Sequence, residues 1–241
     1  TVDNYNVFSD PYVDIDTNLN VLIETLEKCK DRKELVFNFV SSWFVYGKTD
    51  TLPASEINNC NPKGFYSITK RAAEQLLISY CDTFKIKYRI FRLSNVYGIG
   101  DGKVSIRRNA LQYLINEIIN NRDINLYNNG EDIRDFMHVN DICRALHFCM
   151  SNANVNEIIN IGSGIPYKFK DIVGQVREKV GSRSVFKSIE PPEFHKIVQI
   201  KDMWLDITKL KTLGFQPSCK LDEELDILID ALIGGKNEEQ Q

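Results

Sequence analysis

The spacing of apolar residues switches along the chain between the period of a helix and the continuous run of a buried strand. Residues 11–30 carry apolar side chains three and four positions apart, which predicts a helix with one buried face. Residues 35–40 are apolar except for Asn38, and such a run is typical of a parallel strand covered on both faces. The pattern predicts further helices at 66–84, 106–120, 139–150, 169–180, 207–213 and 221–233, and strands at 88–93, 124–127 and 157–161. We therefore expect an α/β fold built on a parallel sheet.

Two stretches show neither the spacing of a helix nor the apolar run of a strand. Residues 47–64 contain two prolines and several asparagines, which predicts a loop. The last eight residues are polar and contain glycine, so we expect them to fray.

Composition narrows the classes of function. The chain has 241 residues, 43% of them hydrophobic and 26% charged, which is ordinary for a soluble globular protein. A net charge of -3 gives no electrostatic reason to expect binding to nucleic acid or to an anionic membrane surface. No apolar run approaches the roughly 20 residues that span a bilayer, and no signal-peptide pattern opens the chain, so we expect a cytoplasmic protein. The six cysteines form no Cys-x-x-Cys pair and the three histidines no cluster, so no metal site is predicted.

Tyr66 and Lys70 are the first candidates for chemistry. They lie four residues apart on the predicted helix 66–84, so they share a face. A phenol has a pKa of about 10, and acting as a base at neutral pH requires about 4 kcal/mol of differential stabilisation of the phenolate. The ammonium of Lys70 can supply part of this, and Ser42, at the end of the preceding strand, can complete a proton-transfer site. Taken alone, the pair also fits an exposed face of an amphipathic helix.

Further motifs lie on both sides of the Tyr66–Lys70 segment, in a specific order along the chain. They are VYG at 45–47, NVYG at 95–98, GEDIRDFMHVND at 130–141, NIGSG at 160–164, LDITK at 205–209 and LGFQP at 213–217. In this order the chain resembles the extended short-chain dehydrogenase/reductase family, and within it the NAD-dependent nucleotide-sugar epimerases and dehydratases. The resemblance implies a partial Rossmann-type parallel sheet with helices on both faces, plus a small α/β substrate-binding lobe. The dinucleotide-binding part would comprise residues 1–100 and return near 139–165, and the substrate lobe would comprise 101–138 and 166–241.

The resemblance also assigns roles around the cofactor. Tyr66 would remove a proton from a sugar hydroxyl while a hydride leaves for NAD, and Lys70 would contact the nicotinamide ribose. Ser42 would orient the hydroxyl, with Ser41 as the weaker candidate for that role. The residues that the family places near the cofactor correspond to Asn18, Ser41, Tyr66, Lys70, Ser94 and Val96.

A second set of residues would hold a nucleoside-diphosphate sugar. Asn95 and Asn109 match family contacts to the substrate. Arg134 is the strongest candidate, because a guanidinium suits the geometry of a diphosphate; a salt bridge to Asp135 or Asp141 is the alternative. Asp141 is expected to cap or brace rather than to react. Lys196 lies near the position where many relatives carry an arginine for the second phosphate contact.

The glycine-rich turn that holds a dinucleotide pyrophosphate is missing from this sequence. Such turns follow a strand and open a helix. Gly98-x-Gly100-x-Gly102 and Gly162-x-Gly164 both lack the third glycine at the right offset. Judged against the family, about three strands would be missing, as in a truncated chain. We therefore expect these 241 residues to bind NAD poorly, and NADP remains an alternative, since the discriminating residues lie in the missing part.

Trp43 and Phe44 bear on the type of reaction. In 4,6-dehydratases of the family these positions carry an aspartate and a glutamate that transfer protons, whereas an indole and a phenyl ring cannot. The sequence therefore favours a nucleotide-sugar epimerase acting through a transient keto-sugar, with both rings lining the cleft. Alternatives are a keto-sugar reductase or dehydratase of the family, or a non-catalytic fragment that binds sugar nucleotide or a partner chain. Helices 11–30 and 65–84 form a dimer interface in similar proteins, so a homodimer is expected.

Overall fold

A three-stranded parallel sheet forms the centre of the larger half of the molecule. The computed structural model describes residues 4–99 and 109–238. The strand order is β1 (Val36–Ser42), β2 (Lys87–Leu93) and β7 (Glu157–Ile161), so β2 is paired on both sides. Its central residues Ile90 and Phe91 are buried on opposite faces. The expected α/β class with a parallel sheet is confirmed.

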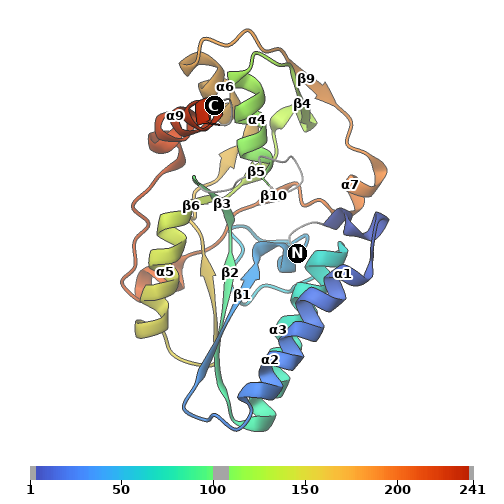
Figure 1. The fold of residues 1–241 in the computed structure, drawn as a ribbon, viewed down its shortest axis with the longest axis vertical. Helices are drawn as coiled ribbons and strands as arrows, with labels where there is room; N and C mark the ends of the chain where they lie inside the picture. Colours follow the sequence, from blue (N-terminus) through green and yellow to red (C-terminus); the bar gives the residue numbers. More distant parts are fainter. Residues whose placement is uncertain (1–3, 100–108, 239–241) are drawn as a thin grey trace.

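Helices cover both faces of this sheet (Figure 1). On one face α2 (Val21–Cys29) and α3 (Phe65–Phe84) bury Leu26 and Leu77 against Ile90. On the other face α5 (Val139–Asn152) contributes to a cluster with Phe91. The connection from β1 to β2 is thus a helical crossover, as parallel pairing requires.

The predicted helix 11–30 is a continuous helical rod with a π-helical turn inside it. The rod consists of α1 (Tyr12–Ile15), the π turn η2 (Asp16–Asn20) and α2. A π turn holds one more residue than an α turn, so it shifts the face that the following residues present. The turn carries Asn18, whose side chain is buried against α3.

The smaller half has its own buried cluster. Helices α4 (Ala110–Ile119), α6 (Phe169–Lys179) and α9 (Leu221–Glu238) pack together with the parallel pair β4 (Ile124–Tyr127) and β9 (Phe186–Ile189). The helix expected at 106–120 is seen from Ala110, and residues 106–108 and the expected boundary at 101 lie outside the described residues. Of the last eight residues, for which fraying is expected, 234–238 form the end of α9, and 239–241 lie outside the described residues.

Short elements connect the two halves. β3 (Asn95–Tyr97) pairs with β6 (Phe136–His138), and β5 (Ile133–Arg134) lies between β10 (Asp202–Met203) and β8 (Tyr167–Lys168). The remaining elements are η1 (Asn4–Phe8), η3 (Trp43–Tyr46), η4 (Asn128–Gly130), α7 (Glu193–Val198) and α8 (Thr208–Thr212). Figure 1 shows η1 and α7, from opposite ends of the chain, side by side. In the described part of the chain no helix combines the length and apolarity needed to cross a membrane.

Candidate active site

Tyr66 lies in the first turn of α3, at the carboxyl end of β1. The helix begins after Gly64, whose backbone N–H donates to the Ser67 hydroxyl at 3.1 Å, and the Ser67 N–H donates to Asn4 Oδ1 at 3.3 Å. These contacts fix the turn that carries Tyr66, which is 6% exposed. The Ser42 hydroxyl, at the end of β1, is a hydrogen-bond partner of the phenol. The structure therefore brings Ser42 and Tyr66 together.

Lys70 follows one turn later on the same face of α3. Its ammonium donates to the carbonyl of Val40 at 2.9 Å and lies 4.5 Å from the centre of the Phe39 ring. Burial lowers the pKa of Lys70, and the charge of Glu74 acts in the opposite direction. The amine is thus held beside the end of the strand that carries Ser42.

The acidic phenol expected from the sequence is not found in this structure. Burial raises the pKa of Tyr66 above its ordinary value of 10, the hydrogen bond with Ser42 lowers it, and the charge of Asp14 raises it. Burial dominates because a phenolate is poorly solvated at a site that is 6% exposed. The phenol is therefore protonated at neutral pH in this state.

The Ser41 side chain takes part in a different network from that of Ser42. Ser41 is buried, and its hydroxyl lies near the Glu74 carboxylate, whose pKa it helps to lower, but it makes no hydrogen bond to a described residue. The guanidinium of Arg92 holds the same carboxylate with two hydrogen bonds, of 3.0 and 2.7 Å, and Arg71 adds a third at 2.7 Å. Adjacent residues on a strand point to opposite faces, which separates Ser41 from Ser42.

The other residues assigned to the cofactor lie near the carboxyl ends of the strands or on the covering helices. Asn18 donates to the Thr69 hydroxyl at 3.0 Å and so braces the π turn against α3. Ser94, directly after β2, is buried, and its hydroxyl has no hydrogen-bond partner among the described residues. Val96 lies in β3, where its carbonyl accepts from Asn109 at 3.4 Å.

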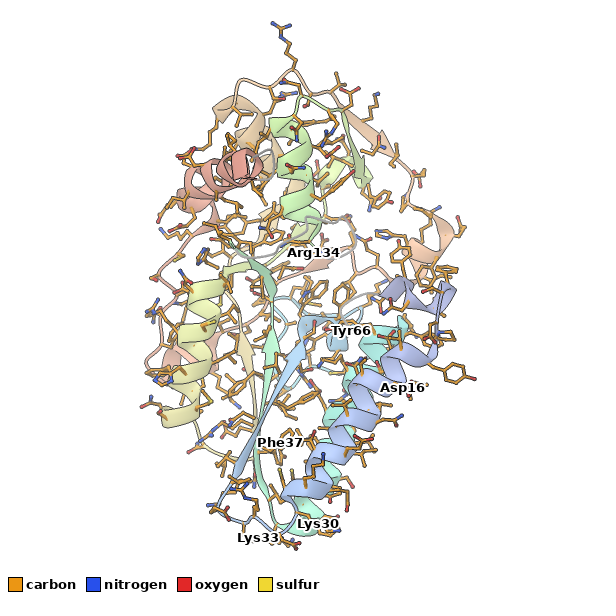
Figure 2. The ribbon with its side chains drawn as sticks, viewed as in Figure 1. Asp16, Lys30, Lys33, Phe37, Tyr66 and Arg134 are labelled. Atoms are coloured by element: carbon orange, nitrogen blue, oxygen red, sulfur yellow. The ribbon has the colours of Figure 1, made fainter. Side chains whose placement is uncertain are left out.

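A cavity of about 460 Å³ opens between the two halves of the molecule. Trp43 and Phe44, the two residues after Ser42, line it as expected from the sequence, and their rings are stacked 3.9 Å apart. The Phe44 ring also meets the Tyr66 ring edge-on at 6.2 Å, so Phe44 connects the phenol to the cavity. Figure 2 shows Tyr66 at the upper end of α3 and Arg134 above it, toward the smaller half.

Arg134 is the cationic side chain in the wall of this cavity. It is 6% exposed, its guanidinium donates to the carbonyls of Ile133 and Lys201 at 2.7 and 2.6 Å, and it lies 5.5 Å from the Trp43 ring. Burial lowers its pKa to about 10. The alternative of a salt bridge is wrong, because no ion pair to Arg134 exists within residues 4–99 and 109–238.

The two acids proposed for that salt bridge brace the backbone instead. Asp135 accepts from the backbone N–H groups of Ser163, Gly164 and Leu205. Asp141 accepts from those of Ser218 and Cys219 and so ties α5 to the segment before α9. The expectation that Asp141 braces rather than reacts agrees with this geometry.

Asn95 is the first residue of β3, and Asn109 directly precedes α4. Asn95 lines the cavity, and its side chain donates to the carbonyl of Asp135 at 3.0 Å. Asn109 caps α4, since its side-chain oxygen accepts from the Gln112 backbone N–H at 3.2 Å. Capping explains the position of Asn109 without a ligand.

Lys196 points away from the cavity. Its ammonium pairs with Glu193 at 3.0 Å and Glu190 at 3.7 Å, and its side chain is 43% exposed. From the same helix, α7, it is His195 that lines the cavity, and Gln199 follows directly after the helix. Sequence reasoning missed both, because six-residue α7 has too short an apolar pattern to show which face is inward.

The described residues fit only one end of a dinucleotide. Ser42, Tyr66 and Lys70, with the unpartnered Ser94 hydroxyl, form a polar edge at the carboxyl ends of β1 and β2, where ligands bind in open α/β sheets. The described residues contain no glycine-rich strand-to-helix turn for a pyrophosphate. The described residues therefore offer hydrogen-bonding groups for one end of a dinucleotide and no such turn for its pyrophosphate. No group of side chains with the composition of a metal site occurs in the described part of the chain.

We expect a polypeptide of these 241 residues to bind NAD with a dissociation constant above the micromolar range. Without a turn of backbone N–H groups, the pyrophosphate charge lacks its usual donors. Isothermal titration calorimetry with NAD measures this directly, and titration of the same preparation with UDP serves as the control for a folded cavity. A dissociation constant of micromolar or tighter would contradict the expectation.

Comparison with known proteins places this geometry in a family. The profile described as "NAD dependent epimerase/dehydratase family" matches residues 5–162. The UDP-glucuronate 4-epimerase of Thermodesulfobacterium geofontis (strain OPF15) is 28% identical over 220 residues, which are 89% of this chain and 64% of that protein.

Solved structures show the same fold. The UDP-glucose 4-epimerase of Thermotoga maritima, crystallised with UDP-glucose, matches with a TM-score of 0.87 at 24% identity, over 98% of this chain and 75% of that one. The UDP-glucose 4-epimerase of Thermus thermophilus, in complex with NAD, matches with a TM-score of 0.83 at 21% identity, over 97% of this chain and 75% of that one.

Proposed function

Because this chain belongs to the NAD-dependent epimerase/dehydratase family of enzymes, we propose that it is a nucleotide-sugar epimerase that acts through a transient keto-sugar. The observation that carries the proposal is the placement of Ser42, Tyr66 and Lys70 together at the end of β1, next to a cavity that contains Arg134. NAD supplies the hydride acceptor when it is bound.

Each residue has a defined part in this proposal. Tyr66 takes the proton from a sugar hydroxyl, and Ser42 orients that hydroxyl through its own hydrogen bond. The Lys70 ammonium, released from the Val40 carbonyl, stabilises the phenolate by its charge. Arg134 holds the diphosphate of the sugar nucleotide at the other end of the cavity, where its guanidinium offers donors in a planar fork.

The apolar pair Trp43–Phe44 favours epimerisation over dehydration. Elimination of water from a sugar needs an acid and a base besides the tyrosine, and these two cavity-lining rings can transfer no proton. The parts of this stacked pair that line the cavity instead provide an apolar surface beside which the keto-sugar can turn over.

The experiment is a survey of UDP-, GDP-, CDP- and dTDP-sugars with NAD, followed by nuclear magnetic resonance of the products. An epimerase yields a sugar inverted at one carbon without net consumption of the cofactor. Loss of water from the product identifies a dehydratase instead, and no conversion of any sugar by a folded protein at an NAD concentration shown to saturate it contradicts the proposal.

A keto-sugar reductase of the same family is the second candidate, because the Tyr66 phenol beside Ser42 can donate its proton to a keto oxygen, the reverse of the proton removal proposed for the epimerase. A reductase consumes reduced cofactor in proportion to product, whereas an epimerase does not, so the same assays distinguish the two.

We propose that the enzyme is a homodimer formed through the α1–η2–α2 rod and α3, and that it is cytoplasmic. Exposed apolar side chains on these helices support the interface: Ile15, Val21 and Ile23 on the rod, and Ile68 and Leu76 on α3.

We expect Leu76→Glu to shift the protein from dimer to monomer in light scattering at micromolar concentration. Leu76 is 41% exposed, so a glutamate there is tolerated in a monomer but would be desolvated at an interface. Ile57→Glu is the matched control, because Ile57 is 94% exposed and lies in the loop between β1 and α3. A wild-type protein that is already monomeric at this concentration contradicts the proposal.

A further inference from the structure

His195 occupies a position in the cavity wall where a second ligand contact is expected. Sequence analysis assigned that contact to Lys196, whose ammonium is instead paired with two exposed glutamates. The neighbouring side chain on α7, His195, lines the cavity together with Arg134. α7 therefore presents an imidazole to the cavity and its lysine to solvent.

Contacts from a distant part of the chain fix the orientation of this imidazole. Its Nδ1 is hydrogen-bonded to the Tyr5 hydroxyl at 2.8 Å, although the two residues are 190 positions apart. The imidazole packs against the Tyr127 ring at 4.5 Å, and Phe194, its neighbour, meets the Tyr5 ring edge-on at 5.1 Å. A side chain held by a hydrogen bond and a ring contact is pre-organised for a specific contact.

The other ring nitrogen is buried without a partner. His195 Nε2 has no hydrogen bond to any described residue. A buried polar atom left in this way costs about 1–3 kcal/mol, so such atoms in a native structure require an explanation. When Nδ1 accepts from Tyr5, the neutral ring carries its hydrogen on Nε2. The unpartnered atom is then a donor, in the same wall as the donors of Arg134.

The imidazole is neutral before a ligand arrives. Burial lowers the pKa of His195, the positive charge of Arg134 lowers it further, and Asp132 opposes both. Tyr5 and Tyr127 are the other titratable groups packed against it. A neutral donor can lie beside Arg134 without charge repulsion, whereas a second cation would be repelled.

We propose that His195, oriented by Tyr5, donates a hydrogen bond from Nε2 to a phosphate oxygen of a nucleoside diphosphate that is also bound by Arg134. The inference rests on the proposed function, since it assumes that the cavity holds a sugar nucleotide. We assign a phosphate oxygen rather than a sugar hydroxyl as the acceptor. His195 and the cationic Arg134 both donate from the same wall, and a phosphate oxygen only accepts hydrogen bonds.

The proposal has a consequence for pH dependence. A bound diphosphate places negative charge beside His195, which favours the imidazolium and raises its pKa relative to the free protein. Binding then takes up a proton, so the affinity for the diphosphate increases as the pH falls from 8 to 6. The diphosphate itself also takes up protons in this range. The change in affinity between pH 8 and pH 6 must therefore be compared between the wild-type protein and a His195 variant.

The test is calorimetric titration of the whole chain with UDP, UMP and uridine at pH 6, 7 and 8. We expect His195→Gln to weaken UDP binding about tenfold at pH 7, the loss of one hydrogen bond to a charged group. We also expect the variant to lose the part of the proton uptake that depends on His195, and to bind uridine as the wild-type protein does. Tyr5→Phe, which removes only the orienting hydroxyl, should weaken UDP binding by a smaller factor.

The matched control is His147→Gln, because His147 is an exposed residue on α5 outside this cavity. It should leave UDP binding unchanged. If uridine binding falls as much as UDP binding in His195→Gln, the residue contacts the nucleoside and the inference is wrong. If UDP binding and proton uptake are unaffected in both His195→Gln and Tyr5→Phe, the inference fails while the proposed function stands. If UDP, UMP and uridine all fail to bind the wild-type chain, the proposed function fails with it.

Discussion

Replacing Tyr66 with phenylalanine is expected to lower kcat by about a thousandfold, with little change in KM. General acid–base catalysis contributes about 10²–10⁴ in rate, and the phenol is the only proton-transferring group that the proposed mechanism places on the reacting hydroxyl. Phenylalanine keeps the ring that meets Phe44 edge-on, so the cavity and its affinity for the substrate should persist. Steady-state kinetics on the sugar nucleotide that the survey identifies provide the measurement.

The control for this substitution is Tyr12→Phe. Tyr12 is 69% exposed at the start of α1, so loss of its hydroxyl should leave both kcat and KM unchanged. Full turnover by Tyr66→Phe would show that another group transfers the proton and would remove the basis for the assigned mechanism.

Replacing Glu74 with glutamine is expected to lower the free energy of unfolding by about 3–5 kcal/mol, which is the usual loss when a buried ion pair is broken from one side. The Glu74 side chain is fully buried and that of Arg92 is 1% exposed. A glutamine cannot neutralise Arg92, which would remain a buried cation against the Tyr46 ring at 4.6 Å. Urea unfolding followed by circular dichroism measures the change.

A double variant separates the charge from the packing. Glu74→Leu combined with Arg92→Met removes both charges and keeps apolar volume, so it should recover most of the lost stability. Glu223→Gln breaks the exposed pair with Lys220 and should leave the urea midpoint unchanged. Equal destabilisation by the single and double variants would show that shape, rather than an uncompensated charge, determines the loss.

The same pair predicts a dependence of stability on pH. Burial alone would raise the pKa of Glu74, but the hydrogen bonds and charge of Arg92 outweigh it and hold the pKa below the ordinary value of 4.5. The unfolded chain therefore takes up this proton at a higher pH than the folded chain. The contribution of Glu74 is present above pH 4.5 and is lost as the pH falls through its folded value.

Long elements with a clear period could be predicted from the sequence. The strands at 124–127 and 157–161 match the structure residue for residue, and the helix expected at 66–84 differs by one residue at its start. Elements of two or three residues, such as β5 and β10, were not predicted, because a segment this short is too short to show a periodic pattern. The expectation that the strand at 35–40 is covered on both faces is wrong, because β1 lies at the edge of its sheet and Val40 is 45% exposed.

Within the candidate site, the relation between residues close in sequence could be predicted, and contacts between residues far apart in sequence could not. Tyr66 and Lys70 are one helical turn apart, so their shared face follows from helix geometry alone. The direction of the Tyr66 pKa shift was wrong, because burial of the phenol depends on packing around α3 rather than on sequence spacing. The pairing of Tyr5 with His195 could not be foreseen either, because neither lies in a motif and the chain between them must fold first.

That separation of 190 residues affects how the protein is made. The cavity has walls from both ends of the chain, since Asn4 and Ile200 line it together. At a synthesis rate of about 5–20 residues per second, some ten seconds or more pass between the synthesis of Tyr5 and that of His195. Throughout this interval Tyr5 and Trp43 have no carboxyl-terminal wall to cover them, so the nascent chain exposes aromatic surface until the residues near Ile200 have been made.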